Sequence, residues 1–164
     1  MDLARVDSLV ESGFGGFLSF GGIAEDHVNV PDKQGVYLIL LPAGFRVNFL
    51  PVGSGGFFKG RNPNVPVPKL WQHWIDGTPI VYIGKAGGAG KSSTLRSRLN
   101  QFLAFGVGKP AGHWGGRYIW QLEDSRGLVV CWKTTRNEPA EEKSALIAEF
   151  KAQFGRRPFA NLRD

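Results

Sequence analysis

Basic side chains are concentrated in one stretch of the sequence that contains no acidic residue, between Asp76 and Glu123. They are Lys85, Lys91, Arg96, Arg98, Lys109 and Arg117. The chain of 164 residues has a net charge of +6, so these side chains equal the whole excess. A localised basic surface is typical of proteins that bind a polyanion, most often nucleic acid. Charge alone leaves open the alternative of a solvated face that keeps the protein in solution.

A glycine-rich segment in this stretch, residues 84–92 (GKAGGAGKS), looks like a phosphate-binding loop. Such a loop has four residues between its first glycine and its Gly-Lys-Ser. Here five residues separate Gly84 from Gly90, and no apolar strand ending in aspartate follows to hold magnesium. We therefore expect a plain loop before a helix and no nucleotide cofactor, although its amide protons can still contact a backbone phosphate.

Composition excludes several other classes of protein. The single cysteine, Cys131, cannot form an internal disulfide or a thiolate metal site, and its apolar surroundings are typical of a buried thiol. The longest apolar run, residues 36–41, is too short to span a bilayer, and charges near the N-terminus leave no signal-peptide core. We expect a cytoplasmic protein with no membrane partner. The oligomeric state stays open.

The elements that must position the basic residues follow from apolar patterning. The length fits one domain, with residues 1–34 as a helix and loop packed on a core of residues 35–164. Apolar residues at helical spacing predict a short helix that ends near Gly13, followed by a loose segment over residues 13–22.

Two buried strands are expected at residues 35–41 and 79–84, where β-branched and large apolar residues are dense. An insertion of about residues 42–78 separates them and is rich in glycine, proline and asparagine. It contains one possible strand at residues 46–52 and a helical turn at residues 70–74.

A helix should follow the second strand, capped by Ser92 or Ser93 and ended by Gly106. Two further strands are expected at residues 115–122 and 127–134, joined by a turn.

The last helix should begin at residues 137–139, place Leu146, Phe150 and Phe154 inward, and end at Gly155. The order β, insertion, β, α, β, β, α predicts an α/β (α+β) domain. Its small central sheet is expected to be mainly antiparallel, with about three strands flanked by helices.

Two of the expected strands carry related tripeptides, Gly35-Val36-Tyr37 and Tyr82-Ile83-Gly84. An arginine-bearing helix follows the second tripeptide, and the acidic last helix is followed by Pro158-Phe159-Ala160-Asn161. In this order, over about residues 35–161, these elements resemble the GIY-YIG nuclease superfamily. The segment 113–117 (HWGGR) and the ending 157–161 (RPFAN) resemble a bacterial branch of that superfamily.

The resemblance implies a three-stranded antiparallel sheet with flanking helices and metal-dependent cleavage of a nucleic-acid phosphodiester, with DNA the expected substrate. Tyr37 and Tyr82 would end neighbouring strands with their hydroxyls close together, and one would orient or deprotonate the attacking water. A free phenol has a pKa near ~10, so a nearby cation must lower it, and Lys85 is the candidate. Arg98 would clamp the phosphate oxygens.

The resemblance also implies a single Mg²⁺ or Mn²⁺ ion held by a glutamate of the last helix. Glu141, Glu142 and Glu149 all qualify, and Glu142 is preferred because it lies one turn before Leu146. Asn161 would contact the phosphate or support the site. The side chains expected to bind the nucleic-acid backbone are Lys91, Arg96, Lys109 and Arg117.

The chain departs from the superfamily pattern in two places. The 44 residues 38–81 separate the two tyrosines, far more than in the family, and would form a lid, a substrate-contact loop or a sheet extension. Phe102 stands where the family often has a histidine or tyrosine, and His113 is the candidate replacement, with an ordinary loop histidine as the alternative.

Three functions follow. The leading one is a metal-dependent endonuclease. The alternative is a non-catalytic nucleic-acid-binding module on the same fold, because Phe102 has no proton to give. A protein-interaction module would use the aromatic residues of the insertion, which could equally form a small satellite core. These aromatic residues are Phe57, Phe58, Trp71 and Trp74.

Overall fold

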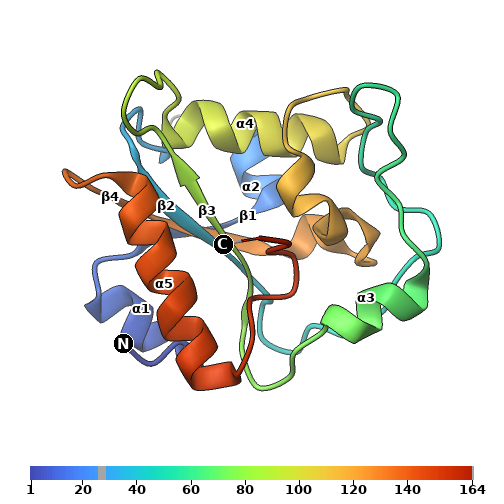
Figure 1. The fold of residues 1–164 in the computed structure, drawn as a ribbon, viewed down its shortest axis with the longest axis horizontal. Helices are drawn as coiled ribbons and strands as arrows, with labels where there is room; N and C mark the ends of the chain where they lie inside the picture. Colours follow the sequence, from blue (N-terminus) through green and yellow to red (C-terminus); the bar gives the residue numbers. More distant parts are fainter. Residues whose placement is uncertain (26–28, 164) are drawn as a thin grey trace.

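A four-stranded sheet organises the protein (Figure 1), whose computed structural model describes residues 1–25 and 29–163. Its strands are β1 (Gly15–Ser19), β2 (Gly35–Leu40), β3 (Ile80–Ala86) and β4 (Val129–Thr134). They lie in the order β1-β4-β2-β3, and every neighbouring pair is antiparallel. The predicted α+β class and antiparallel sheet are confirmed, with four strands where about three were expected.

Every residue of β2 is buried because β2 lies inside the sheet and helices cover both of its faces. Helices α1 (Val6–Glu11) and α5 (Pro139–Phe154) pack on the face that carries Val36, Leu38 and Leu40. We call this the closed face. A strand buried on both sides reads as a continuous apolar run, which is why the sequence pattern predicted β2 so clearly.

The opposite face of the sheet carries Tyr37 and Ile39, and we call it the site face. It is covered by α2 (Phe20–Glu25), α4 (Leu95–Gly106) and the 3₁₀ segment η2 (Trp114–Gln121). Large aromatic rings from these elements form its core. A short 3₁₀ turn, η3 (Ser125–Gly127), leads into β4.

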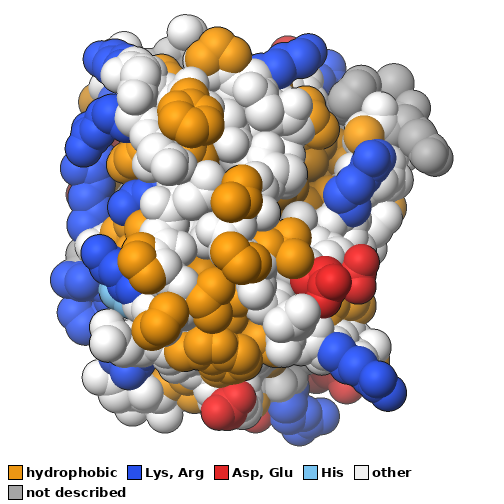
Figure 2. All heavy atoms as spheres, turned by 90° about the vertical axis from the view of Figure 1, so that its right-hand side faces the viewer, with side chains coloured by type: hydrophobic (Ala, Val, Ile, Leu, Met, Phe, Trp, Pro, Cys, Tyr) orange, Lys and Arg blue, Asp and Glu red, His pale blue; other side chains and the backbone are white. Residues whose placement is uncertain are grey.

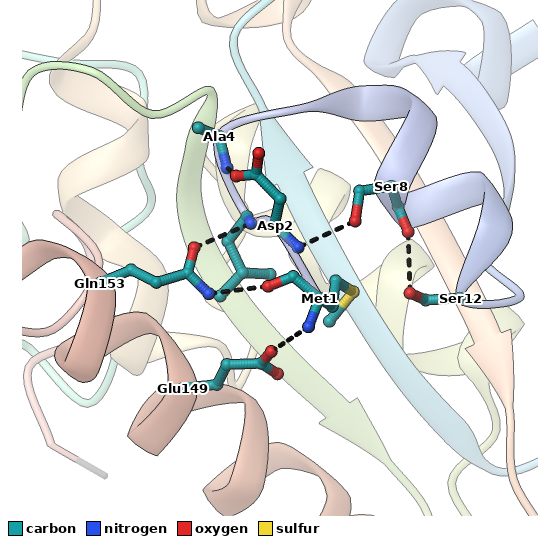
Figure 3. Close-up of polar contacts among 8 residues, drawn as sticks. Met1, Asp2, Ala4, Ser8, Ser12, Glu149 and Gln153 are labelled. Atoms are coloured by element: carbon teal, nitrogen blue, oxygen red, sulfur yellow. Dashed lines mark hydrogen bonds and ion pairs between the residues drawn. The ribbon is translucent and has the colours of Figure 1, made fainter.

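The beginning of the chain is attached to α5 by polar contacts (Figure 3). The amino group of Met1 pairs with the Glu149 carboxylate. The Gln153 amide accepts from the backbone N–H of Leu3 at 2.9 Å and donates to the carbonyl of Met1 at 2.7 Å. Glu149 is therefore engaged by the N-terminal segment.

The insertion contains α3 (Val67–His73) and is held to η2 by the buried Gln121. The Gln121 amide donates to the carbonyls of Leu50 at 3.0 Å and Val65 at 2.9 Å, and it accepts from the N–H of Val65 at 2.9 Å. Trp74 packs edge-on against Phe49, with ring centroids 5.7 Å apart. The insertion therefore joins the core of the site face, of which Phe49 is part and against which Trp74 packs.

The outer surface of the insertion exposes apolar side chains. Figure 2 faces this side of the molecule and shows a broad apolar area over its centre, with lysines and arginines gathered at the left edge. Val52, Phe57 and Trp71 are exposed by 72%, 55% and 48%.

Several predicted elements are confirmed. The predicted strands at 35–41, 79–84 and 127–134 correspond to β2, β3 and β4, and the last helix corresponds to α5. Cys131 is a fully buried thiol whose pKa is raised by burial to about 12. No helix in the described part of the chain has the length and apolar character needed to cross a membrane.

Four expectations about secondary structure were wrong. Residues 13–22 are not a loose segment, because they contain β1 and the start of α2, so the first 34 residues also supply a strand. Residues 115–122 lie mostly in η2, a 3₁₀ segment and not a strand, in which the consecutive residues 118–121 are buried. The expected strand at 46–52 is reduced to one bridge, between Phe49 and Leu122.

The cap of α4 was also misplaced. Thr94 accepts from the N–H of Ser97, and the Ser97 side chain accepts from the N–H of Thr94 in return, which forms a capping box. The Ser93 hydroxyl instead accepts from the N–H of Gly87 at 3.1 Å. The serine therefore stabilises the glycine-rich loop and not the helix.

Candidate functional site

A cavity of about 590 Å³ lies beside β3, which is one of the two edge strands of the sheet. Residues from β2, β3, the glycine-rich loop, α4, η2, α5 and the C-terminal tail line it. Its basic lining side chains are Lys85, Lys91, Arg98, Arg117, Lys143 and Arg163. Among the described residues that line it, none is acidic. Positive charges from separate parts of the sequence therefore meet at one cavity.

The Tyr37 ring crosses over β3 at Gly84, its partner in the strand register. A Cβ atom at Gly84 would lie 2.1 Å from Cζ of Tyr37, so only glycine leaves room for the ring. The Tyr37 and Tyr82 rings lie 6.1 Å apart between centroids. The second tripeptide thus contributes Tyr82 to the site, and its Gly84 leaves the space that the Tyr37 ring occupies.

The Tyr37 hydroxyl is hydrogen-bonded to Nε2 of His113 at 2.9 Å. His113 is fully buried and packs against the Phe102 ring with centroids 4.4 Å apart. Its Nδ1 has no hydrogen-bond partner within the described residues. The Phe102 ring therefore packs against His113, and His113 is hydrogen-bonded to Tyr37, one of the predicted site residues.

Burial, followed by the positive charge of Arg98, lowers the pKa of His113 to about 3. The imidazole is therefore neutral at physiological pH. Burial raises the pKa of Tyr37 well above its usual value of 10.0, and the neighbouring Tyr82 raises it further. The pKa of Tyr82 is also raised by burial. The two phenols and the histidine are all uncharged near neutral pH.

Arg98 is the cation that acts on the two tyrosines, since its charge lowers the pKa of both against the effect of burial. The expectation that Lys85 has this role is not supported by the geometry. The Lys85 ammonium instead donates to the carbonyl of Gly87 at 3.3 Å. Lys85 lines the cavity but supports the glycine-rich loop.

Backbone and side-chain bonds orient the Arg98 guanidinium at the cavity. Its Nη1 donates to Oε1 of Gln101 at 3.0 Å and to the carbonyl of Gly112 at 3.1 Å. The capping box at the start of α4 fixes the first helical turn, from which Arg98 projects. An arginine held in this way is pre-oriented for the oxygens of a phosphate.

The half-buried Trp114 forms an aromatic part of the lining, and two arginines contact its ring. The guanidinium carbon of Arg117 lies 4.7 Å from the Trp114 ring centroid, and that of Arg61 lies at 5.1 Å. Burial lowers the pKa of Arg117, whose Nε has no hydrogen-bond partner among the described residues. Arg61 belongs to the insertion, which therefore contacts a residue of the lining.

Asn161 attaches the C-terminal tail to the open edge of β3. Its Oδ1 accepts from the N–H of Ile83 at 2.8 Å, and its Nδ2 donates to the Ile83 carbonyl at 2.9 Å. The side-chain amide thus satisfies an edge position of the sheet. Asn161 also lines the cavity. Because its two hydrogen bonds fix the tail along β3, Arg163, two residues later, lines the cavity as well.

Some of the predicted site residues do not line this cavity. Nε of Arg96 donates to the carbonyl of Val30 at 2.9 Å, and Lys109 is an exposed residue outside the lining. Oε1 of Glu142 accepts from the Thr135 hydroxyl at 3.1 Å, and Glu142 is not part of the lining either. The cavity brings together Tyr37, Tyr82, Lys85, Lys91, Arg98, Arg117 and Asn161, with His113 directly behind Tyr37.

Two basic residues of the lining were not predicted from the sequence, Lys143 and Arg163. Helical periodicity carried a signal for the first, because Lys143 lies three residues before Leu146 and four before Ile147, both buried. Arg163 follows Asn161 by two residues in a tail that the sequence already showed to be basic.

No family model matches the chain, and comparisons with curated proteins and solved structures gave no match. The resemblance to the GIY-YIG superfamily therefore stays a hypothesis based on the residues quoted above.

The metal that the resemblance implies is a Mg²⁺ or Mn²⁺ ion. Mg²⁺ is bound by carboxylate oxygens and water, and no described lining residue carries a carboxylate. The described residues also contain no group of three or more potential metal ligands. The lining does not fit Mg²⁺ or Mn²⁺.

Proposed function

We propose that this protein binds nucleic acid by holding its phosphodiester backbone in the cavity beside β3. The observation that carries the proposal is the lining itself, which has six lysines and arginines and, among its described residues, no acid. Phosphates are fixed unit charges, and basic side chains that neutralise them release condensed counterions. Arg98 is the central contact because its guanidinium is already oriented.

Trp114 favours a nucleic acid over a simple phosphate. A half-buried indole at a basic cavity offers a flat surface on which a base can stack, whatever its sequence. Two arginines contact the ring, and a guanidinium plane can itself stack on a base. A single strand or a frayed end presents both an accessible phosphate and an unstacked base, so we expect tighter binding to single-stranded than to duplex substrates.

The test is a titration of labelled single-stranded DNA, duplex DNA and RNA at several salt concentrations. If about six phosphates are neutralised, the logarithm of the affinity should fall against the logarithm of salt with a slope near ~5 for duplex DNA and ~4 for a single strand. Arg98→Ala should weaken binding by at least about tenfold. Arg126→Ala, a change at an exposed residue of η3 outside the cavity, is the matched control. Absent or salt-independent binding would refute the proposal.

A second candidate function is cleavage of the bound phosphodiester, as the resemblance implies. The hydrogen bond between Tyr37 and His113 favours it, because a phenol that shares a proton with an imidazole beside a phosphate clamp can move a proton to or from a reacting oxygen. The pKa values oppose it. A phenol with a raised pKa and an imidazole with a pKa of about 3 exchange a proton unfavourably, so we expect slow turnover.

Cleavage is tested by incubating plasmid, single-stranded DNA and RNA with the purified protein, with and without Mg²⁺. If cleavage occurs, Tyr37→Phe should remove it while binding is kept, because the ring fills the same space without its hydroxyl. If no substrate is cut under any condition, binding is the function and this second candidate is rejected.

A further inference from the structure

We infer that Lys143 and its basic neighbours, and not a divalent cation, neutralise the phosphate in this cavity. The inference rests on the proposed binding function and adds the source of the positive charge. It gives a role to a residue that neither the motif nor the charge pattern had singled out.

Helix α5 determines which side chain points into the cavity. Its buried residues Pro139, Leu146 and Ile147 mark the side that faces the sheet. Lys143 lies four residues after the first and three before the second, so it shares that side and lines the cavity. Glu142 is rotated from it by about 100° around the helix axis. Its carboxylate meets Thr135 instead.

The other glutamates of this part of the chain are also directed elsewhere. Glu149 pairs with the amino group of Met1, and Glu141 is exposed outside the lining. Glu138 comes nearest, since its Oε2 accepts from the N–H of Ala89 at 3.0 Å in the glycine-rich loop. It too lies outside the lining. None of these four carboxylates is presented to a phosphate in the cavity.

The electrostatics of the lining point the same way. A divalent cation placed among lysines and arginines is repelled, and without carboxylates nothing offsets its loss of hydration. A lysine ammonium already supplies a positive charge and three donors for phosphate oxygens. Lys143 on α5 and Arg98 on α4 belong to elements on opposite faces of the sheet, yet both line the cavity. A phosphate bound between Lys143 and Arg98 would contact one cation from each helix.

The first measurement compares the binding of a labelled single-stranded oligonucleotide in EDTA and in Mg²⁺ at matched ionic strength. The wild-type protein should bind at least as tightly in EDTA. A strict requirement for Mg²⁺ or Mn²⁺ would overturn the inference.

The second measurement uses Lys143 variants. Lys143→Gln should weaken binding about three- to tenfold and reduce the salt slope by about 1, as expected for the loss of one phosphate contact. Lys143→Glu should abolish binding in EDTA and regain part of it with Mn²⁺, because it places a carboxylate in the lining. Glu142→Gln and Lys151→Gln, on the same helix outside the cavity, are controls and should bind like the wild type. Thermal melts verify that each variant is folded.

The outcomes separate the inference from the function on which it rests. If the wild-type protein binds no nucleic acid with or without metal, the proposed function fails. If it binds but the Lys143 variants bind equally well, or if Glu142→Gln abolishes a metal-dependent interaction, the function stands and the inference fails.

Discussion

The two faces of β2 use the same strand for different purposes. On the closed face, Leu38 and its neighbours pack with apolar side chains from α1 and α5. On the site face, the hydroxyl of Tyr37 lies in an aromatic core and is hydrogen-bonded to His113. The closed face contributes stability mainly through apolar burial. The other contains buried polar groups whose stability depends on being paired, and it opens onto the cationic cavity.

The largest effect is expected on the closed face. Leu38→Ala removes a fully buried side chain and should lower the free energy of unfolding by about 3 kcal/mol. Oligonucleotide affinity of the folded protein should be unchanged, because no lining residue is touched. Urea denaturation and a binding titration measure the two quantities. Val10→Ala, at a residue of α1 that is 53% exposed, is the control. A marked loss of affinity in Leu38→Ala would show that the two faces are not independent.

On the site face, Gly84→Ala should be nearly as destabilising, by about 2 to 3 kcal/mol, because the new Cβ overlaps the Tyr37 ring. Unlike the leucine variant, it should also weaken binding, since Tyr37 must move within the cavity wall. Gly127→Ala is a matched control, as a Cβ there meets nothing within 4 Å. Equal stability of these two glycine variants would contradict the packing of Tyr37 over β3.

The pH dependence of stability should also distinguish the faces. His113 has a pKa of about 3 in the folded protein against 6.5 for a free histidine, so below pH 6.5 the unfolded chain takes up its proton first. The free energy of unfolding therefore carries no cost from His113 above pH 6.5, and it falls by up to about 1.4 kcal/mol per pH unit as the pH drops toward 3.

His113→Gln should flatten this pH profile of denaturation. His73→Gln should flatten it less, because burial also lowers the pKa of His73 but this residue is only half-buried. A wild-type profile that coincides with that of His113→Gln would show that the imidazole is not buried in its neutral form.

The smallest effect is expected from removing one oxygen. Tyr37→Phe leaves Nε2 of His113 without its partner and should cost about 1 to 2 kcal/mol. Denaturation of the single variants and of the double variant with His113→Gln gives the coupling energy between the two side chains. A coupling energy near zero would argue that the hydrogen bond does not form in solution.

Much of the fold was predictable because its signals are local. The apolar runs of β2, β3 and β4 and the periodicity of α5 each lie within a few residues of sequence. β1 was missed because Gly15 and Gly16 disguise a short strand, whose pairing partner β4 lies far along the chain. η2 was mistaken for a strand because a short apolar run has the same sequence pattern in either structure.

The candidate site divides in the same way. Tyr37, Tyr82 and Arg98 were identified from ordered motifs, and the cavity does bring them together. Glu142, preferred over Glu141 and Glu149 as the metal ligand, does not line the cavity, whereas the adjacent Lys143 does, because one residue turns a helical side chain by about 100°. Sequence periodicity limits that choice, but only the docking of α5 against the sheet decides it.

By itself, the sequence determined the antiparallel core strands, the two long helices and a stretch of basic residues with no acid between Asp76 and Glu123. These features depend on neighbouring residues and on periodicity. Only the tertiary structure decided that His113 pairs with Tyr37, that Lys143 and not Glu142 lines the cavity, and that the tail returns along β3. Such contacts join residues far apart in the chain, and their geometry is set by how whole elements pack and not by any local pattern.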